Sequence, residues 1–539
     1  MLRSSYSLGV LTVGLALSTF GRGTGGGQAA GRTVTLERTV HALQRGIIPA
    51  EGQSPDSLER KRRDGLQRIV SSDRGAAAGA AYVPGRVLVK FKDDAPSSAR
   101  TLAVSAASAR ARATRATLSA TRPSHANFDT LAIGELDDPE AVANALRQRT
   151  EVEYAQAAYR VRRRFVPDDR YYPLQWNLPL IDLERAWDLQ PAAGSTKIVA
   201  VLDTGIAFAD ATIGVHAYAF VDADGIVYPA LGDVTLRFVA APELGSSSRF
   251  VDPYDFIWND NAPVDMDGHG THVAGTIGQL TNNGSAGGDS ANGGGTAGVA
   301  FNVKIMPVKV LDGPWDIIFG SPYEGTDDTV ARGIRYATDR GAHVINMSLG
   351  RTGPPSPVVE DAIRYAVGRG TFVAIAGGNG YEDGNAVEVL AEIASRVPGA
   401  VSVAAVTRDR QRAYYSTTGS YIELAAPGGA FDSQGAKGGI LQQTLDLDLV
   451  DRFLLPPSQF SAPRFDALAY YYFTGTSQAT PHVSGLAAML MQQGVGSPAA
   501  VEAALEQVAI DLGPPGRDPT FGYGLVSARA ALRGLGLAR

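Results

Sequence analysis

The chain has 539 residues, of which 44% are hydrophobic and 19% are charged, with a formal net charge of −6. This composition supports a large core and excludes global disorder, and the mild acidity argues against a nucleic-acid-binding protein. No cysteine is present, which excludes disulfides, thiolate metal sites and a cysteine nucleophile.

Residues 1–30 have the features of a signal peptide, so we expect a secreted, extracellular protein. Arg3 supplies a positive charge, and residues 8–17 form an apolar run that is too short to span a membrane. The alternative is a short buried core segment. No later run is long enough for a stable membrane span, and residues 31–81 are expected to be a leader or linker without recognisable chemistry.

Residues 82–160 are expected to form a small α+β domain. Residues 86–92 have the pattern of a strand, and residues 138–149 have the pattern of a helix that begins after an aspartate. A basic run at residues 160–164 (RVRRR) follows and leads into a proline-containing joint. This composition is typical of an exposed linker.

Strand-like and helix-like segments alternate after Trp176. The apolar runs of strand length lie at residues 198–202, 304–310, 343–347, 371–376 and 400–406. Helical patterns lie between them, at residues 328–340 and 358–369. Apolar runs separated by helices predict an α/β fold, with a doubly wound parallel sheet that helices cover on both faces. Chemistry is then expected just beyond the carboxyl ends of the strands.

Asp203 directly follows the first of these runs, in the string VLDTGI. A buried carboxylate is costly unless it is hydrogen-bonded or paired, although an aspartate here could equally cap the next turn. His269 lies in DGHGTHVAGTI, and histidine is the usual general base near neutral pH. His269 and His272 have a spacing that metal ligands can have, but the glutamate of a zinc-protease HExxH motif is missing.

Ser477 lies in GTSQATPHVSG, at the expected start of an apolar helix. A serine there is most often a helix cap. The free N–H groups and the dipole of the helix can also stabilise an oxyanion that forms when Ser477 attacks a carbonyl. Asn379, in AGGNG after another apolar run, can donate a second hydrogen bond to that oxyanion; the alternative is an ordinary turn residue.

Together and in this order, the strings VLDTGI, GHGTHVAGTI, NMSLG, AGGNG and GTSQATPHVSG resemble the subtilisin-like serine peptidases, or subtilases. The resemblance implies a subtilisin-like domain over residues 171–535 that hydrolyses peptide bonds in proteins through an acyl-enzyme. It implies that Ser477 is the nucleophile and that His269 is the general base and acid. It also implies that Asp203 orients His269 and that Asn379 donates a hydrogen bond to the oxyanion.

The resemblance also implies which segments bind the substrate and which inhibit the enzyme. The Ser348-Leu349-Gly350 segment matches the backbone strand that pairs with protein or peptide substrates in this family. Residues 82–160 resemble the inhibitory propeptide, with a ferredoxin-like fold. We expect self-activation by a cut between Tyr159 and Tyr171, and a monomeric mature enzyme without a catalytic cofactor.

Structural calcium is expected because the family commonly binds it, with ligands that the sequence leaves unknown. Asn282 and Asn283 match a loop that often helps to hold the ion. The sequence Asp222-x-Asp224-Gly225 resembles a calcium-binding turn.

This sequence departs from the family pattern at several places. Extra chain at residues 217–256 and 429–473 is expected to form insertions that shape substrate access. Gln478 stands where the family usually has methionine, and Gly377 where it commonly has alanine.

Three other interpretations compete with a broad endopeptidase. The insertions allow a narrow maturase that cuts only itself or one partner, and the same fold also serves non-catalytic binding proteins. The acid-acting sedolisin branch requires a glutamate base, and His269 argues against it.

Overall fold

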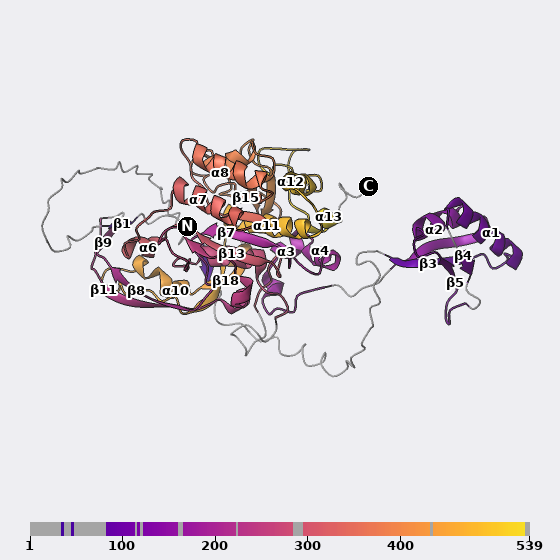
Figure 1. Cartoon of the computed structure of the whole chain (residues 1–539), viewed down its shortest axis with the longest axis horizontal. Coiled ribbons are helices and arrows are strands. Elements are labelled where there is room, and N and C mark those ends of the chain that lie inside the picture. The colour runs from indigo at the N-terminus through magenta and orange to yellow at the C-terminus, as the bar shows by residue number, and fades with distance from the viewer. Residues whose placement is uncertain are drawn as a thin grey trace, which may run out of the picture.

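The computed structural model describes most of the chain beyond residue 81 and two short strands before it. The described residues are 34–36, 45–47, 82–113, 116–118, 122–159, 165–222, 225–283, 295–431 and 435–533. The expected signal peptide and the basic run at residues 160–164 lie outside them. Figure 1 shows a small unit, residues 82–159, apart from a much larger one. No helix in the described part of the chain is both long and apolar enough to cross a membrane.

A seven-stranded parallel sheet forms the centre of the large unit (Figure 1). In spatial order its strands are β12 (Tyr254–Asp255), β13 (Lys304–Lys309), β7 (Ile198–Asp203), β14 (Val344–Met347), β15 (Phe372–Ala376), β16 (Ala400–Val406) and β17 (Leu424–Pro427). The five apolar runs of the sequence are all strands of this sheet, which confirms the predicted fold class. The register places Lys309 beside Asp203, at the carboxyl ends of β13 and β7.

Helices cover both faces of this sheet. The helices α7 (Asp327–Asp339) and α8 (Pro357–Gly368) pack against each other, and α5 (His269–Gly278) packs against α11 (Thr476–Gln492). Both predicted helices are thus present, as α7 and α8. The remaining α-helices of the large unit are α3 (Asn177–Leu180), α4 (Leu183–Leu189), α6 (Pro314–Ile318), α9 (Val389–Ala394), α10 (Leu447–Val450), α12 (Pro498–Glu506) and α13 (Ala528–Leu532). Its 3₁₀ helices are η2 (Tyr172–Leu174), η3 (Pro242–Leu244), η4 (Ser247–Arg249), η5 (Ala436–Gly438) and η6 (Asp451–Leu454).

The small unit is an antiparallel sheet with two helices. Its elements are β3 (Tyr82–Phe91), α1 (Ser97–Arg110), β4 (Ala116–Leu118), β5 (Asp129–Ile133), α2 (Pro139–Arg147) and β6 (Val152–Tyr159). The sheet order β4-β5-β3-β6 and the βαββαβ succession are those of a ferredoxin-like fold. Helix α2 begins as predicted, since the Asp138 carboxylate accepts the Glu140 N–H at 2.9 Å.

The two expected insertions pack against each other. The first contains β9 (Phe220–Asp222), β10 (Val227–Tyr228) and β11 (Gly232–Phe238), and β11 pairs with the preceding strand β8 (Ala211–Ala217). The second contains β18 (Ile440–Leu445) and β19 (Leu468–Phe473). The rings of Phe220 and Tyr228 stack at 4.4 Å, and Phe460 from the second insertion lies 5.3 Å from Phe220. The strands β1 (Val34–Leu36) and β2 (Arg45–Ile47) pair with β9 and β19 respectively.

Candidate active site

Asp203 and His269 meet at the carboxyl end of the central sheet. Asp203 is the last residue of β7 and is fully buried, and its Oδ1 lies 2.7 Å from His269 Nδ1. The Thr204 N–H donates to the same oxygen at 2.8 Å. His269 is the first residue of α5 and keeps 12% of its side chain exposed. The strand end therefore buries the carboxylate while the imidazole still reaches the surface.

The environment of His269 favours its charged form. Burial opposes the imidazolium, but the Asp203 carboxylate outweighs this effect, and the Asp267 and Asp265 charges add to it. Their net effect raises the pKa of His269 above its ordinary value of 6.5. An imidazole that is easily protonated and held at Nδ1 by a carboxylate is suited to accept a proton at its other nitrogen.

Thr204 and Asp265 hold the strand end and the start of α5 together. The Thr204 hydroxyl donates to Asp265 Oδ1 and accepts the Gly270 N–H, both at 3.0 Å. The other Asp265 oxygen accepts the Thr271 hydroxyl at 2.6 Å. A Cβ at Gly270 would lie only 2.1 Å from the Gly205 carbonyl oxygen, so the close approach of these segments requires glycine.

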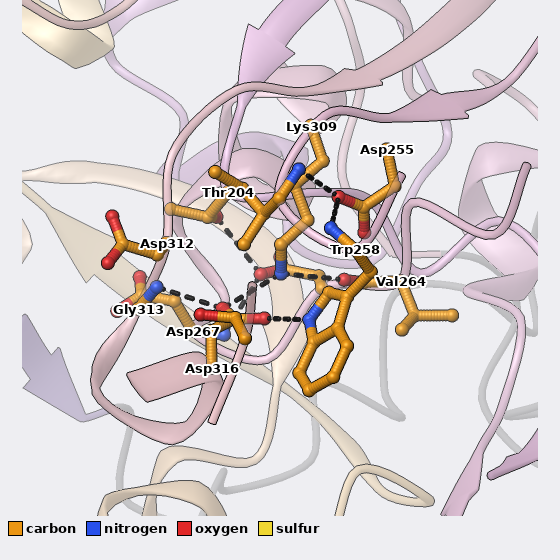
Figure 2. Close-up of polar contacts among 12 residues, drawn as sticks. Thr204, Asp255, Trp258, Val264, Asp267, Lys309, Asp312, Gly313 and Asp316 are labelled. Carbon is orange, nitrogen blue, oxygen red and sulfur yellow. Dashed lines mark hydrogen bonds and ion pairs between the residues drawn. The ribbon is translucent and has the colours of Figure 1, made fainter. Parts of the chain in front are cut away.

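A buried ion pair joins Lys309, at the end of β13, to Asp316 (Figure 2). Lys309 Nζ is 2.9 Å from Asp316 Oδ2, and both side chains are buried. Burial acts against the ammonium, but Asp316 and Asp255 outweigh it and raise the pKa of Lys309. The Trp258 indole N–H and the Gly313 N–H also donate to Asp316, at 2.7 and 2.9 Å.

Asp255 connects this ion pair to the edge strand β12. Its Oδ1 accepts the N–H groups of Ile257 and Trp258, and burial raises the pKa of its carboxyl to about 7 although Lys309 acts to lower it. The end of β13 beside Asp203 is therefore anchored by buried charges from three segments of the chain.

Ser477 is the second residue of α11, directly after the turn at Gly475 and Thr476. Its hydroxyl donates to the Ser348 carbonyl oxygen at 3.1 Å, and the Ser348 hydroxyl donates to the Ser477 carbonyl oxygen at 2.7 Å. This reciprocal pair fixes the start of α11 against the segment that follows β14.

Asn379 lies on the other side of Ser477. Its Oδ1 accepts the N–H and the hydroxyl of Thr476, at 2.9 and 3.0 Å, which fixes the direction of its Nδ2. A Cβ placed at Gly475 would lie 3.6 Å from both Asn379 Nδ2 and Ser477 N. The two N–H donors therefore border the same small space.

The structure thus brings the predicted site residues together in two groups. Asp203 and His269 form one, and Ser348, Asn379 and Ser477 form the other. Sequence reasoning missed Thr204, Asp265 and Lys309, although Thr204 lies inside the motif VLDTGI and Asp265 only two residues before DGHGTHVAGTI.

Residues from three segments of the chain, near Asp169, Glu243 and Asn283, have the chemistry of a calcium site. Asp169 and Glu243 are 97% and 99% buried, and the Asn283 Oδ1 atom is buried without a hydrogen-bond partner among the described residues. Burial, with the charges of Asp168 and Glu243, raises the pKa of Asp169 to about 6. Buried carboxylates and a free amide oxygen fit a hard divalent cation. The side-chain oxygen of Asn282 already has a partner, unlike that of Asn283, because it accepts the Asp168 N–H at 2.7 Å.

Comparison with known proteins identifies relatives of both units. The model of the subtilase family matches residues 194–524, and that of the fervidolysin N-terminal prodomain matches residues 70–157. A thermophilic serine proteinase of Bacillus sp. (strain AK1) is 30% identical over 89% of this chain and 95% of its own length. Thermitase of Thermoactinomyces vulgaris is 30% identical over 64% of this chain and 92% of its own. An extracellular protease of Xanthomonas campestris pv. campestris is 31% identical over 68% of this chain and 56% of its own.

The Lys309–Asp316 pair should be far more important for stability than an exposed pair. We expect Lys309→Met to lower the free energy of unfolding by about 3–5 kcal/mol, because it leaves buried carboxylates without their cation. Guanidinium-induced unfolding would measure the change. The control is Arg364→Met, which breaks an exposed pair with Glu360 and should cost at most about 1 kcal/mol. Equal losses in both variants would contradict the anchoring role of Lys309.

Proposed function

Because this chain belongs to the subtilase family and is therefore a serine protease, we propose that Asp203, His269 and Ser477 are its catalytic triad. The contact that carries the proposal is the 2.7 Å approach of His269 Nδ1 to the buried Asp203 carboxylate. It leaves the other ring nitrogen of His269 as the proton acceptor, with Ser477 as the nucleophile at the start of α11.

The proposed reaction is acyl transfer to Ser477 followed by hydrolysis. The hydroxyl turns from the Ser348 carbonyl to His269, and its oxygen attacks the carbonyl carbon of the substrate while His269 Nε2 takes the proton. Asp203 stabilises the imidazolium that forms. As the C–N bond breaks, His269 returns the proton to the leaving amine, and a water molecule then cleaves the acyl-enzyme with the same base.

Two N–H groups are proposed to stabilise the oxyanion of the tetrahedral intermediates. Ser477 N and Asn379 Nδ2 border one space beside Gly475, and Thr476 holds the Asn379 amide in place. Donors that are fixed before the reaction need no reorganisation when the negative charge develops. The Ser348-Leu349-Gly350 segment, whose first residue is hydrogen-bonded to Ser477, is proposed to pair with the substrate backbone.

The small unit is proposed to be the inhibitory propeptide of the large one. The ferredoxin-like fold and the prodomain match to residues 70–157 support this role. Removal by a cut between Tyr159 and Tyr171 would then activate the enzyme. The similarity to an extracellular protease supports secretion, for which residues 1–30 would be the signal peptide.

Calcium is proposed to stabilise the large unit. Members of the family generally bind calcium, and Asp169, Glu243 and Asn283 supply oxygen atoms that suit it. When bound, the ion would neutralise buried carboxylate charge and would take no part in the reaction. The reaction itself is carried by side chains and backbone N–H groups.

Loss of the Ser477 hydroxyl should abolish proteolysis. We expect Ser477→Ala to reduce casein hydrolysis by about 10⁶-fold, a magnitude measured in subtilisin, a member of this family. N-terminal sequencing should find the parent shortened past Tyr159 and the variant intact. Ser497→Ala, which removes only the N-cap hydroxyl of α12, is the matched control and should stay active.

Two other results would change the account. A parent that shortens itself but leaves casein intact would be a narrow maturase. A Ser477→Ala protein that digests casein like the parent would overturn the triad.

Activity should decline toward acid pH, because only neutral His269 can accept the proton. Since Asp203 raises the pKa of His269, kcat/KM should fall as the pH drops through a value above 6.5. In Asp203→Asn the inflection should move to lower pH, and activity should fall about 10⁴-fold. Rates of peptide hydrolysis between pH 4 and 9 would measure both. A pH-independent rate over this range would contradict the role of His269.

Removal of calcium should destabilise the protein. We expect excess EDTA to lower the midpoint of thermal unfolding by roughly 5 °C or more, because an ion that binds only the folded state stabilises it. Added Ca²⁺ should restore the midpoint and Mg²⁺ should not. Asn283→Ala should lose most of the response to EDTA. An unchanged midpoint with EDTA would exclude a stabilising calcium ion.

A further inference from the structure

Glu388 is a buried carboxylate that the proposed mechanism does not use. It precedes α9 and is 92% buried, and its Oε1 atom has no hydrogen-bond partner among the described residues. Burial raises the pKa of its carboxyl to about 7, although Arg351 acts to lower it. Because an uncompensated buried charge is costly, a folded protein rarely keeps one without a partner.

The charge of Arg351 acts on Glu388, but its guanidinium group forms its hydrogen bonds with other partners. Arg351 donates two hydrogen bonds to Asp327, at 2.8 and 2.6 Å, and a third to the Pro354 carbonyl at 2.8 Å. Its backbone instead fixes the position of Glu388, since the Val389 N–H donates to the Arg351 carbonyl at 2.9 Å. The carboxylate is therefore held in place, while its Oε1 atom has no hydrogen-bond partner among the described residues.

Two glycines face this carboxylate. A Cβ at Gly350 would lie 2.2 Å from Glu388 Oε1, and a Cβ at Gly378 would lie 3.0 Å from Glu388 Oε2. The Gly378 backbone has a φ of +105°, which disfavours any other residue. Both segments thus bring backbone atoms, and no side chain of their own, against the carboxylate.

The same two segments lead directly to the reacting groups. Gly378 immediately precedes Asn379, and Gly350 follows Ser348, whose carbonyl oxygen is 3.1 Å from Ser477 Oγ. A substrate carbonyl bound at Ser477 would bring the side chain of its own residue close to these segments. That side chain would point between Gly350 and Gly378, toward Glu388.

We propose that Glu388 selects substrates in which a lysine or arginine supplies the carbonyl of the cut bond. This specificity rests on the proposed function and adds the substrate class to it. An ammonium or guanidinium group would meet the unpartnered carboxylate oxygen and neutralise its charge in a site shielded from water. An apolar side chain would leave the same charge buried and unpaired.

The chain carries a substrate of this kind in its own joint. Residues 160–164 read RVRRR, with four arginines between the small and the large unit. These residues lie within the stretch in which the activating cut is expected. Selection by Glu388 therefore places that cut after one of these arginines.

Matched peptide p-nitroanilides that differ only in the residue before the cut would test the specificity. We expect kcat/KM for arginine and lysine to exceed that for leucine and phenylalanine at least about 10-fold. The variant Glu388→Gln keeps the volume and removes the charge, and it should lower the arginine-to-leucine ratio about 100-fold. Glu382→Gln removes an exposed carboxylate from the same loop and should leave the ratio unchanged.

Benzamidine, a small cationic probe, separates binding from turnover. Calorimetry should show binding to the parent and at least about 100-fold weaker binding to Glu388→Gln. The thermal midpoint of this variant should be equal to that of the parent or higher, since an unpaired buried charge is removed. A midpoint in this range confirms that the variant is folded.

The outcomes distinguish this specificity from the proposed function. If casein is digested but leucine or phenylalanine is preferred, or if Glu388→Gln keeps the parental ratio, the role of Glu388 is wrong and the protease account stands. If nothing is hydrolysed while benzamidine binding still depends on Glu388, the cation site stands and the catalytic account fails. Binding that does not depend on Glu388 would overturn the site.

Discussion

The buried carboxylate of Asp203 is the constraint on which the active-site region depends. A charge at the end of a buried parallel strand is tolerated only when hydrogen bonds satisfy it. His269 and Thr204 both reach the same oxygen, at 2.7 and 2.8 Å, and Asp265 connects Thr204 to the helix that begins at His269. The sheet thus sets the depth of the carboxylate, and this depth sets the position of the proposed base.

Two buried charges in this domain, Lys309 and Glu388, differ in how the fold compensates them. Asp316 neutralises the charge of Lys309, and this ion pair anchors the end of β13 beside Asp203. Glu388 has one carboxylate oxygen without a hydrogen-bond partner among the described residues, and it lies beside the segments that lead to Ser477. A local violation of the pairing rule, placed next to the reacting groups, is where selection of a ligand is expected.

The sequence predicts the sheet well because each apolar run by itself indicates a buried strand. The proposed triad could also be predicted from the sequence, since the residues around His269 and Ser477 form specific strings. The partners of buried charges could not be predicted, because they depend on tertiary contacts. Glu388 looks like an ordinary acidic residue before a helix until Gly350 is placed against it. Likewise, nothing local indicates that Phe220 and Phe460 bring the two insertions together.

Labelling with a fluorophosphonate is the most direct test of the central claim, that His269 and Asp203 activate Ser477 as a nucleophile. This reagent modifies a serine only when a neighbouring base activates it. We expect a single adduct in the peptide that contains Ser477, and much slower labelling of Asp203→Asn. An unlabelled protein, or an adduct on a different serine, would contradict the account.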